Sequence, residues 1–169
     1  MVTGSTERGH PRGCIVCLGH SDRGDDGVGP LVADEIRRSH PDVDVRECRD
    51  PFDVLDVVAD TVVVVDAARI VADPVRGTDA AGTVHVVTDV EQAQASRGLA
   101  STHGFGLAEV LALVGEIEGD RPRVMLVAVV GERFDMGAGA SDAVTAAVPA
   151  AAEQAVRLLR DSSETAGER

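Results

Sequence analysis

Four consecutive valines, Val62 to Val65, constrain the fold of this chain more than any other feature. With Thr61 they form a run of β-branched residues that is bounded by carboxylates at Asp60 and Asp66. β-Branched side chains favour extended backbone, because their χ1 freedom is restricted. A strand whose successive residues are all apolar has no polar face and is buried on both sides. This pattern is typical of a central strand in a parallel sheet. The run therefore predicts an α/β domain.

The flanking sequence alternates between strand-like and helix-like patterns. Strands are expected at Cys14–Leu18, Val43–Cys48, Thr61–Val65, Thr83–Val87 and Val124–Val130. Helices are expected at Gly27–Ser39, Phe52–Ala59, Gly104–Glu118 and from Ser141 to about Arg160. This repeated order predicts a three-layer, doubly wound α/β fold with a mostly parallel sheet flanked by helices. We expect a single domain at residues 13–160, between disordered tails at 1–12 and 161–169.

Charge and composition exclude several functional classes. The chain has 169 residues, with 16 Lys plus Arg against 29 Asp plus Glu, and a formal net charge of −13. Nucleic acids and anionic membranes attract clustered positive charge, so neither is expected as a partner. No apolar run approaches the ~20 residues of a membrane helix, and the polar N-terminus has no apolar region typical of a secretion signal. We therefore expect a cytoplasmic protein without membrane insertion.

The chain contains three cysteines, Cys14, Cys17 and Cys48. An odd count without a secretion signal indicates a reducing compartment. Cys14 and Cys17 form a C-x-x-C pair, but residues three apart in a strand face opposite sides of a sheet. No second Cys/His pair stands at zinc-finger spacing. We interpret the pair as core residues rather than as a redox or zinc motif.

Candidate site residues are the polar residues that follow the predicted strands, because doubly wound folds bind ligands beyond the carboxyl ends of their strands. The glycine-rich loop 19–29 follows the first strand and contains Asp25 and Asp26. It has neither G-x-G-x-x-G nor G-K-[S/T] spacing, and two carboxylates would repel a phosphate. The competing interpretation is that one of the two aspartates caps the helix that follows.

Asp66 and His103 complete the set of candidate site residues. Asp66 closes the valine run, where a buried carboxylate is costly unless it is hydrogen-bonded, paired or metal-bound; the alternative is a turn residue. His103 lies at the predicted start of a helix; the alternative is an ordinary surface residue. Together Asp26, Asp66 and His103 supply two carboxylates and one imidazole, which suits a divalent transition metal with positions left for water or substrate. No Ser-His-Asp triad or activated cysteine is recognisable.

Three segments, in order and spacing, resemble the nickel–iron hydrogenase maturation endopeptidases (peptidase family M52, which process the C-terminal end of the hydrogenase large subunit). They are residues 23–29, Val65–Ala67 and Thr102–Leu107, with a weaker match at 131–134 and 141–149. The resemblance covers roughly residues 13 to 160. It implies a fold of the phosphorylase/hydrolase-like kind.

The resemblance also implies an activity and a site. Members of this family remove the C-terminal extension of the hydrogenase large-subunit precursor, after a basic residue and after nickel insertion. The metal-contacting residues carry over to Asp26, Asp66 and His103. The nickel is supplied by the precursor, which is the expected partner, and no permanently bound cofactor is expected. This describes a hydrolase, a metal-dependent aspartic-type endopeptidase, in which nickel polarises the scissile carbonyl or activates a water.

Two positions depart from the family pattern. His20 stands where the family usually has Asn, and brings a second imidazole that either adds a ligand or holds the loop. Residues 49–52 replace a common Gly-Thr pair before the second helix. That second departure bears on which hydrogenase precursor is processed more than on the chemistry.

Two rival functions remain. A nickel-sensing chaperone or checkpoint that binds the precursor without cutting it would use the same three residues, but would leave the precursor's length unchanged. A flavodoxin-like flavin or nucleotide domain is disfavoured by the two acidic residues in the first loop, and by the absence of Trp and Tyr.

Overall fold

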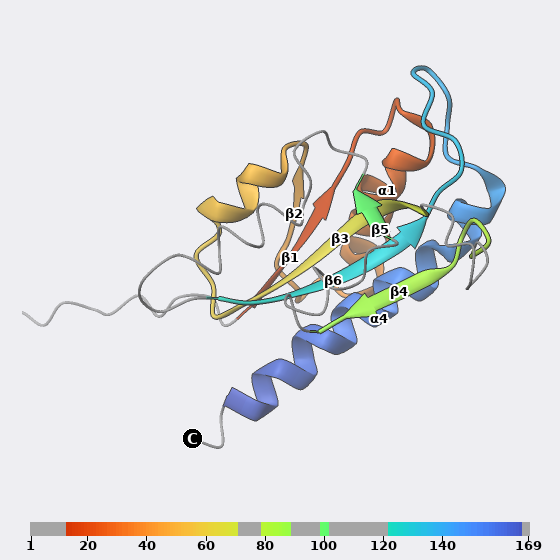
Figure 1. Ribbon diagram of the computed structural model, residues 1–169. Helices are drawn as coiled ribbons and strands as arrows, with labels where there is room; N and C mark the ends of the chain where they lie inside the picture. The colour runs from red at the N-terminus through yellow and green to blue at the C-terminus, as the bar shows by residue number, and fades with distance from the viewer. Residues whose placement is uncertain (1–12, 71–78, 89–98, 102–121, 167–169) are drawn as a thin grey trace, which may run out of the picture.

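A computed structural model describes residues 13–70, 79–88, 99–101 and 122–166 of the chain (Figure 1). Its six strands are β1 (Gly13–Leu18), β2 (Val45–Cys48), β3 (Thr61–Ile70), β4 (Val84–Val87), β5 (Leu99–Ser101) and β6 (Arg123–Val130). Its helices are η1 (Gly24–Gly27), α1 (Val28–Ser39), η2 (Pro51–Asp56) and α4 (Asp142–Ala166), where η marks a 3-10 helix. The expected helix at 104–118 and the expected tail at 1–12 lie outside the described residues.

The strands form one sheet in the order β2-β1-β3-β6-β4, with β5 paired to the far end of β3. β1 pairs in parallel with both β2 and β3, and β3 pairs in parallel with β6. β4 and β5 are antiparallel to their partners. The mostly parallel α/β sheet flanked by helices is therefore confirmed, with the valine run at its centre.

The two faces of the sheet are covered by different elements. On one face α1 and α4 pack against each other and against the sheet (Figure 1). On the other face, Val54 and Val57 of the η2 segment pack on side chains of β1 and β3. Successive strand residues alternate between these faces. Cys14 accordingly belongs to the η2 face and Cys17 to the α1/α4 face, as expected for two core residues.

Strand β3 is longer than we predicted. The valine pattern placed its end at Val65, but the strand continues to Ile70. The extension is held by β6, whose register reaches Ala68, and by β5, which pairs with residues 68–70. Both partners are remote in sequence. Asp66 therefore lies within the strand and not after it.

Helix boundaries also differ from the expected ones. α4 runs to Ala166, so the six residues from Asp161 that we assigned to a disordered tail are helical. Ser162 is buried, with its hydroxyl donating to Leu158 O at 2.8 Å, which attaches this last stretch to the helix and the core. η2 is a 3-10 helix that starts earlier than predicted, at Pro51, because Asp50 forms a capping box with it. In the part of the chain that the structure describes, no helix combines the length and apolar character needed to cross a membrane.

Candidate active site

The first loop places two acidic residues at the carboxyl edge of the sheet. β1 ends at Leu18, and the chain passes through η1 into α1. Gly29 is required early in α1, because a Cβ there would overlap the carbonyl oxygen of Leu18. Gly19 has φ +133°, and a Cβ on it would overlap the carbonyl oxygen of Asp26. These close approaches hold Asp25 and Asp26 directly against the end of β1.

Asp25 binds a loop that is distant in sequence. Its Oδ2 accepts hydrogen bonds from the backbone N–H groups of Glu132 (2.8 Å) and Arg133 (3.0 Å), and its Oδ1 accepts one from Ser141 N–H (2.6 Å). The side chain is fully buried. Burial raises the pKa of Asp25, but the hydrogen bonds from Ser141, Arg133 and Glu132 outweigh it and leave the pKa lowered. Asp25 therefore fastens the loop 131–141 to the first loop.

The helix-cap interpretation of this acidic pair is wrong. The N-cap residues of η1 and α1 are Arg23 and Gly27, and neither helix has a side-chain hydrogen bond at its cap. Asp25 is directed to the loop 131–141 and Asp26 to His20. The partners of Asp25 lie 107 or more residues away, so local sequence carried no sign of this role.

Asp26 is fully buried and lies against His20. Its Oδ2 accepts a hydrogen bond from His20 N–H at 3.0 Å and lies 3.1 Å from His20 Nδ1. An ionised carboxylate can only accept, so this contact is a hydrogen bond in the tautomer that carries the proton on Nδ1. The His20 side chain is 29% exposed, so it lies between the buried carboxylate and solvent. The sequence departure at His20 is thus in direct contact with a candidate site residue.

Asp66 lies on β3 opposite Ala128 of β6, and is 3% exposed. Its Oδ1 accepts a hydrogen bond from the following N–H, of Ala67, at 2.8 Å. Its position in a ten-residue strand contradicts the turn in the alternative interpretation, although the bond to a local backbone N–H agrees with that interpretation. Side-chain alternation with Val62 and Val64 directs Asp66 to the η2 face of the sheet.

The fold brings the elements that carry these two aspartates together. β1 and β3 are neighbouring parallel strands, with Cys17 paired to Val65, and η1 lies against β3. His103 lies outside the described residues. The described chain reaches Ser101, two residues before it, and Ser101 pairs with Ala68, two residues beyond Asp66. Within the described ranges, no three His, Cys, Asp or Glu side chains group in a way that could hold a metal ion.

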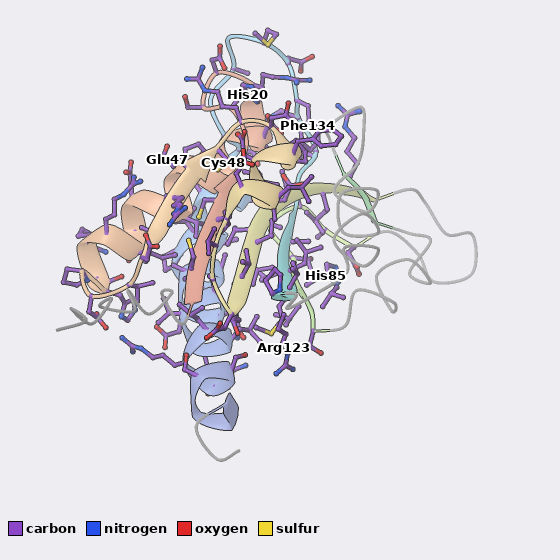
Figure 2. All side chains as sticks on the ribbon, turned by 90° about the vertical axis from the view of Figure 1, so that its left-hand side faces the viewer. His20, Glu47, Cys48, His85, Arg123 and Phe134 are labelled. Carbon is purple, nitrogen blue, oxygen red and sulfur yellow. The ribbon has the colours of Figure 1, made fainter. Side chains whose placement is uncertain are left out.

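The loop 131–141 is a component of this edge whose role we did not predict. Gly131 N–H donates to Ala68 O at 3.0 Å, and Gly24 N–H donates to Ala138 O at 2.8 Å. Phe134 packs over Gly131, and the guanidinium of Arg69 lies 4.3 Å from the centre of its ring. Figure 2 shows His20 and Phe134 at the same end of the molecule. The sequence signal was the glycine and mixed charges that follow β6.

The cysteines take no part in this site. Cys14 and Cys17 are fully buried and all three cysteines are free thiols. Burial raises the pKa of Cys14 to about 12 and also raises the pKa of Cys17. A thiol with a raised pKa is a poor nucleophile at neutral pH.

Solved structures with the same fold are available for comparison. The [NiFe] hydrogenase maturation protease HybD from Thermococcus kodakarensis superposes with a TM-score of 0.71, at 24% identity, over 88% of this chain and 99% of that one. The hydrogenase maturating endopeptidase HybD from E. coli gives a TM-score of 0.67, at 23% identity, over 89% and 93%. These similarities concern the fold. Among curated protein sequences, no significant match was found.

The family comparison reaches further than the fold. The sequence profile of the family HycI, described as hydrogenase maturation protease, matches residues 51–158, which is more than half of the chain. The matched region includes β3 with Asp66, and the loop that Asp25 fastens. This chain belongs to the hydrogenase maturation protease family.

Proposed function

We propose that this chain is an endopeptidase that removes the C-terminal extension of a nickel–iron hydrogenase large-subunit precursor after nickel insertion. The observation that supports this function best is the pair of buried carboxylates, Asp26 and Asp66, on adjacent elements at the carboxyl edge of the sheet. Membership of the maturation protease family supplies the reaction class. The free thiols fit a reducing compartment, so we expect the chain to act in the cytoplasm.

The proposed chemistry divides between precursor and protease. The precursor's nickel is the recognition element, and Asp26, Asp66 and His103 contact it. Carboxylate oxygens and an imidazole nitrogen are suitable donors for a divalent transition metal. Nickel held there would supply Lewis-acid chemistry to the scissile carbonyl or to a water. Asp26 or Asp66 would accept a proton from the attacking water and return it to the leaving amine as the C–N bond breaks. This makes the chain a metal-dependent endopeptidase of aspartic type whose metal arrives with its substrate.

His20 has a defined place in this proposal. Its two donors to Asp26 restrain that carboxylate in one orientation, which favours a fixed approach to the nickel. Its contact through Nδ1 supports a positioning role for the imidazole toward Asp26.

The test is the intact mass of a nickel-loaded large-subunit precursor, incubated with wild-type protein or with Asp26→Asn, Asp66→Asn or His103→Ala. Asp22→Asn is the matched control, since Asp22 is an exposed carboxylate of the same loop and the charge change is identical. We expect wild type and Asp22→Asn to release the C-terminal peptide. We expect the three site variants to leave at least ~99% of the C-terminal peptide attached over the same time. Loss of a reacting group lowers the rate of cleavage roughly 10²-fold or more. Circular dichroism melts of each variant separate loss of chemistry from loss of fold.

The other outcomes decide between the remaining functions. Binding of the precursor without any change of its mass would favour the non-cleaving chaperone. Cleavage by Asp26→Asn or Asp66→Asn at the wild-type rate would remove the proposed residue roles while leaving the endopeptidase activity in place.

A further inference from the structure

Several arginines at the carboxyl edge of the sheet have no carboxylate partner among the described residues, and two of them are restrained by their surroundings. These two are Arg23, directly before η1, and Arg69, near the end of β3. Four arginines elsewhere in the fold are paired with carboxylates, namely Arg37, Arg38, Arg46 and Arg160. Acidic residues outnumber basic ones in this chain by 29 to 16, so partners are abundant. Arg23 and Arg69 are distinguished by what surrounds their side chains: an aromatic ring lies against Arg69, and the Nε of Arg23 is shielded from solvent.

Arg69 is held in place by an aromatic ring. Its guanidinium carbon lies 4.3 Å from the centre of the Phe134 ring, a cation–π contact. Phe134 is only 9% exposed and its ring packs on Gly131, where a Cβ would come within 2.7 Å of it. Gly131 in turn is hydrogen-bonded to Ala68, the residue before Arg69. The guanidinium is thus supported by a fixed surface, and its hydrogen-bond donors have no partner among the described residues.

Arg23 is restrained through its backbone. Its carbonyl oxygen accepts a hydrogen bond from Asp26 N–H at 3.2 Å, and the next residue, Gly24, is bonded to Ala138. The side chain is partly buried, and its Nε is shielded from solvent without any hydrogen-bond partner among the described residues. A shielded donor with no acceptor is unfavourable. The terminal Nη groups of Arg23 are not among the shielded, unpartnered atoms of the described residues, so these are the donors that a ligand can reach.

The two arginines belong to the same part of the edge. A Cβ on Gly24 would come within 3.4 Å of Phe134 Cα, so the segment that carries Arg23 contacts the segment that supports Arg69. Asp26 lies three residues after Arg23, and Asp66 three residues before Arg69. In strand β3, Asp66 and Arg69 face opposite sides of the sheet. A peptide that crosses the edge would meet the carboxylate on one side and the guanidinium on the other.

We propose that Arg23 and Arg69 form a carboxylate-binding subsite that holds an acidic group of the precursor's C-terminal extension beside Asp26 and Asp66. This inference rests on the proposed function. A guanidinium presents a planar fork of N–H donors that matches a carboxylate in two parallel hydrogen bonds, which gives orientation as well as attraction. A localised positive site also lets an acidic segment approach a chain whose net charge is −13. The acidic group is either a side chain or the terminal carboxylate of the extension.

The test measures Kd and the cleavage parameters of a nickel-loaded precursor with Arg23→Gln, Arg69→Gln and Arg123→Gln. Arg123 is the matched control, because it is exposed, has no carboxylate partner among the described residues, and lies at the opposite end of the molecule (Figure 2). We expect each of the first two variants to raise Kd and KM about tenfold, as loss of a charge-assisted hydrogen bond does, with kcat unchanged. Arg123→Gln leaves both constants at wild-type values. Arg23→Gln should not lower the melting temperature, because the substitution breaks no described hydrogen bond or ion pair and removes a shielded donor without an acceptor.

Two altered precursors identify the source of the carboxylate. In one, the acidic residues of the extension are changed to amides; in the other, the C-terminus is lengthened by Gly-Ser. The effect of the arginine substitutions should disappear with one of these precursors. If it persists with both, or if Arg23→Gln and Arg69→Gln match Arg123→Gln with the unaltered precursor, the subsite does not exist. Normal binding without cleavage by the wild type would count against the proposed function, while Kd still tests the subsite.

Discussion

Adjacent carboxylates in the first loop have separate roles because they face different partners. Asp25 accepts three backbone N–H groups of the loop 131–141, and Asp26 accepts both donors of His20. Both side chains are fully buried, so burial alone does not tell them apart. The distinction lies in what each carboxylate binds. Replacing one should change stability, and replacing the other should change catalysis.

Asp25→Asn is expected to lower the free energy of unfolding by about 2–4 kcal/mol, because an amide leaves buried N–H donors without an acceptor. Urea unfolding at pH 7 measures this, with Asp22→Asn as the exposed control. The lowered pKa of Asp25 adds a pH dependence. Its stabilisation is present above the unfolded pKa of about 4 and is lost as pH falls through the folded value. The difference between wild type and variant should therefore shrink below about pH 4; a constant difference would contradict the role.

His20→Asn and His20→Ala test how the imidazole supports Asp26. An Asn side chain can place its N–H₂ near the position of Nδ1, whereas Ala leaves only the backbone donor. We expect Asn to keep precursor cleavage within about threefold of wild type and Ala to lower kcat about tenfold, the effect of one charge-assisted hydrogen bond. Single-turnover cleavage measures both. Equal loss in the two variants would show that the ring itself contacts the substrate.

At the scale of helices and strands, a prediction from sequence is accurate where the signal lies within the element itself. It fails where distant residues decide the boundary of the element. The valine run and the pattern of α1 are local, and both elements formed where expected, within a residue at the start of α1. The end of β3 at Ile70 depends on β5, a three-residue strand 29 or more positions away that has no pattern of its own. The partners of Asp25 are similarly remote. The site roles of Asp26 and Asp66 stay predictions from sequence, and their hydrogen bonds could not be predicted from it.

The contact between α1 and β1 leaves no space for an added side chain at Gly29. Gly29→Ala would drive a Cβ into the carbonyl oxygen of Leu18, at the end of the strand. Neither backbone can yield without moving the first loop, so we expect a loss of about 3–5 kcal/mol, the size seen when a well-packed core is strained. Gly139→Ala is the control, since a Cβ there meets nothing within 4 Å. Thermal melts of the two variants make the comparison, and equal melting temperatures would overturn it.

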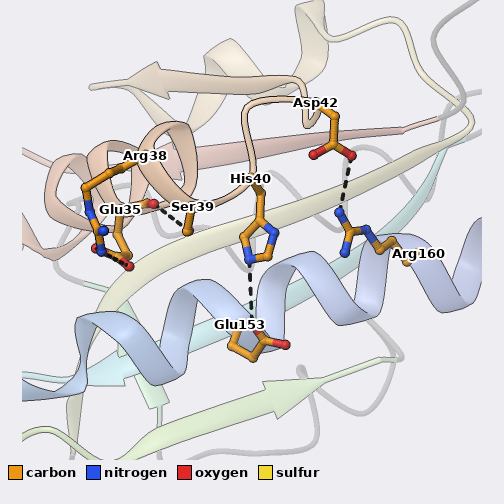
Figure 3. A network of polar contacts seen from close by, with 7 residues as sticks. All are labelled: Glu35, Arg38, Ser39, His40, Asp42, Glu153 and Arg160. Atoms are coloured by element: carbon orange, nitrogen blue, oxygen red, sulfur yellow. Dashed lines mark hydrogen bonds and ion pairs between the residues drawn. The ribbon is translucent and has the colours of Figure 1, made fainter.

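At the scale of the whole molecule, the ion pairs among the described residues lie mostly at the surface, while the chain carries a large net negative charge. Figure 3 shows one set of pairs between the α1 end and α4, with His40 Nε2 3.5 Å from Glu153 and Arg160 3.2 Å from Asp42. Glu153, Asp42 and Arg160 are more than half exposed. Exposed pairs of this kind contribute about 0–1 kcal/mol each. They offset little of the repulsion that a net charge of −13 produces.

Added salt should therefore stabilise this protein. At about 0.15 M ionic strength the Debye length is roughly 8 Å, so repulsion among distant surface carboxylates is screened, while the exposed pairs lose only a fraction of a small contribution. We expect the melting temperature at pH 7 to rise by a few degrees between about 0.01 and 0.15 M NaCl, since about 1 kcal/mol corresponds to roughly 2–4 °C in a domain of this size. Arg160→Ala should shift it by less than that. The same salt increase should weaken binding of the precursor if Arg23 and Arg69 hold a carboxylate, because that attraction is screened too. If added salt raises the melting temperature and also raises the Kd of the precursor, two electrostatic effects are present. One is repulsion over the whole surface, and the other is local attraction at the site.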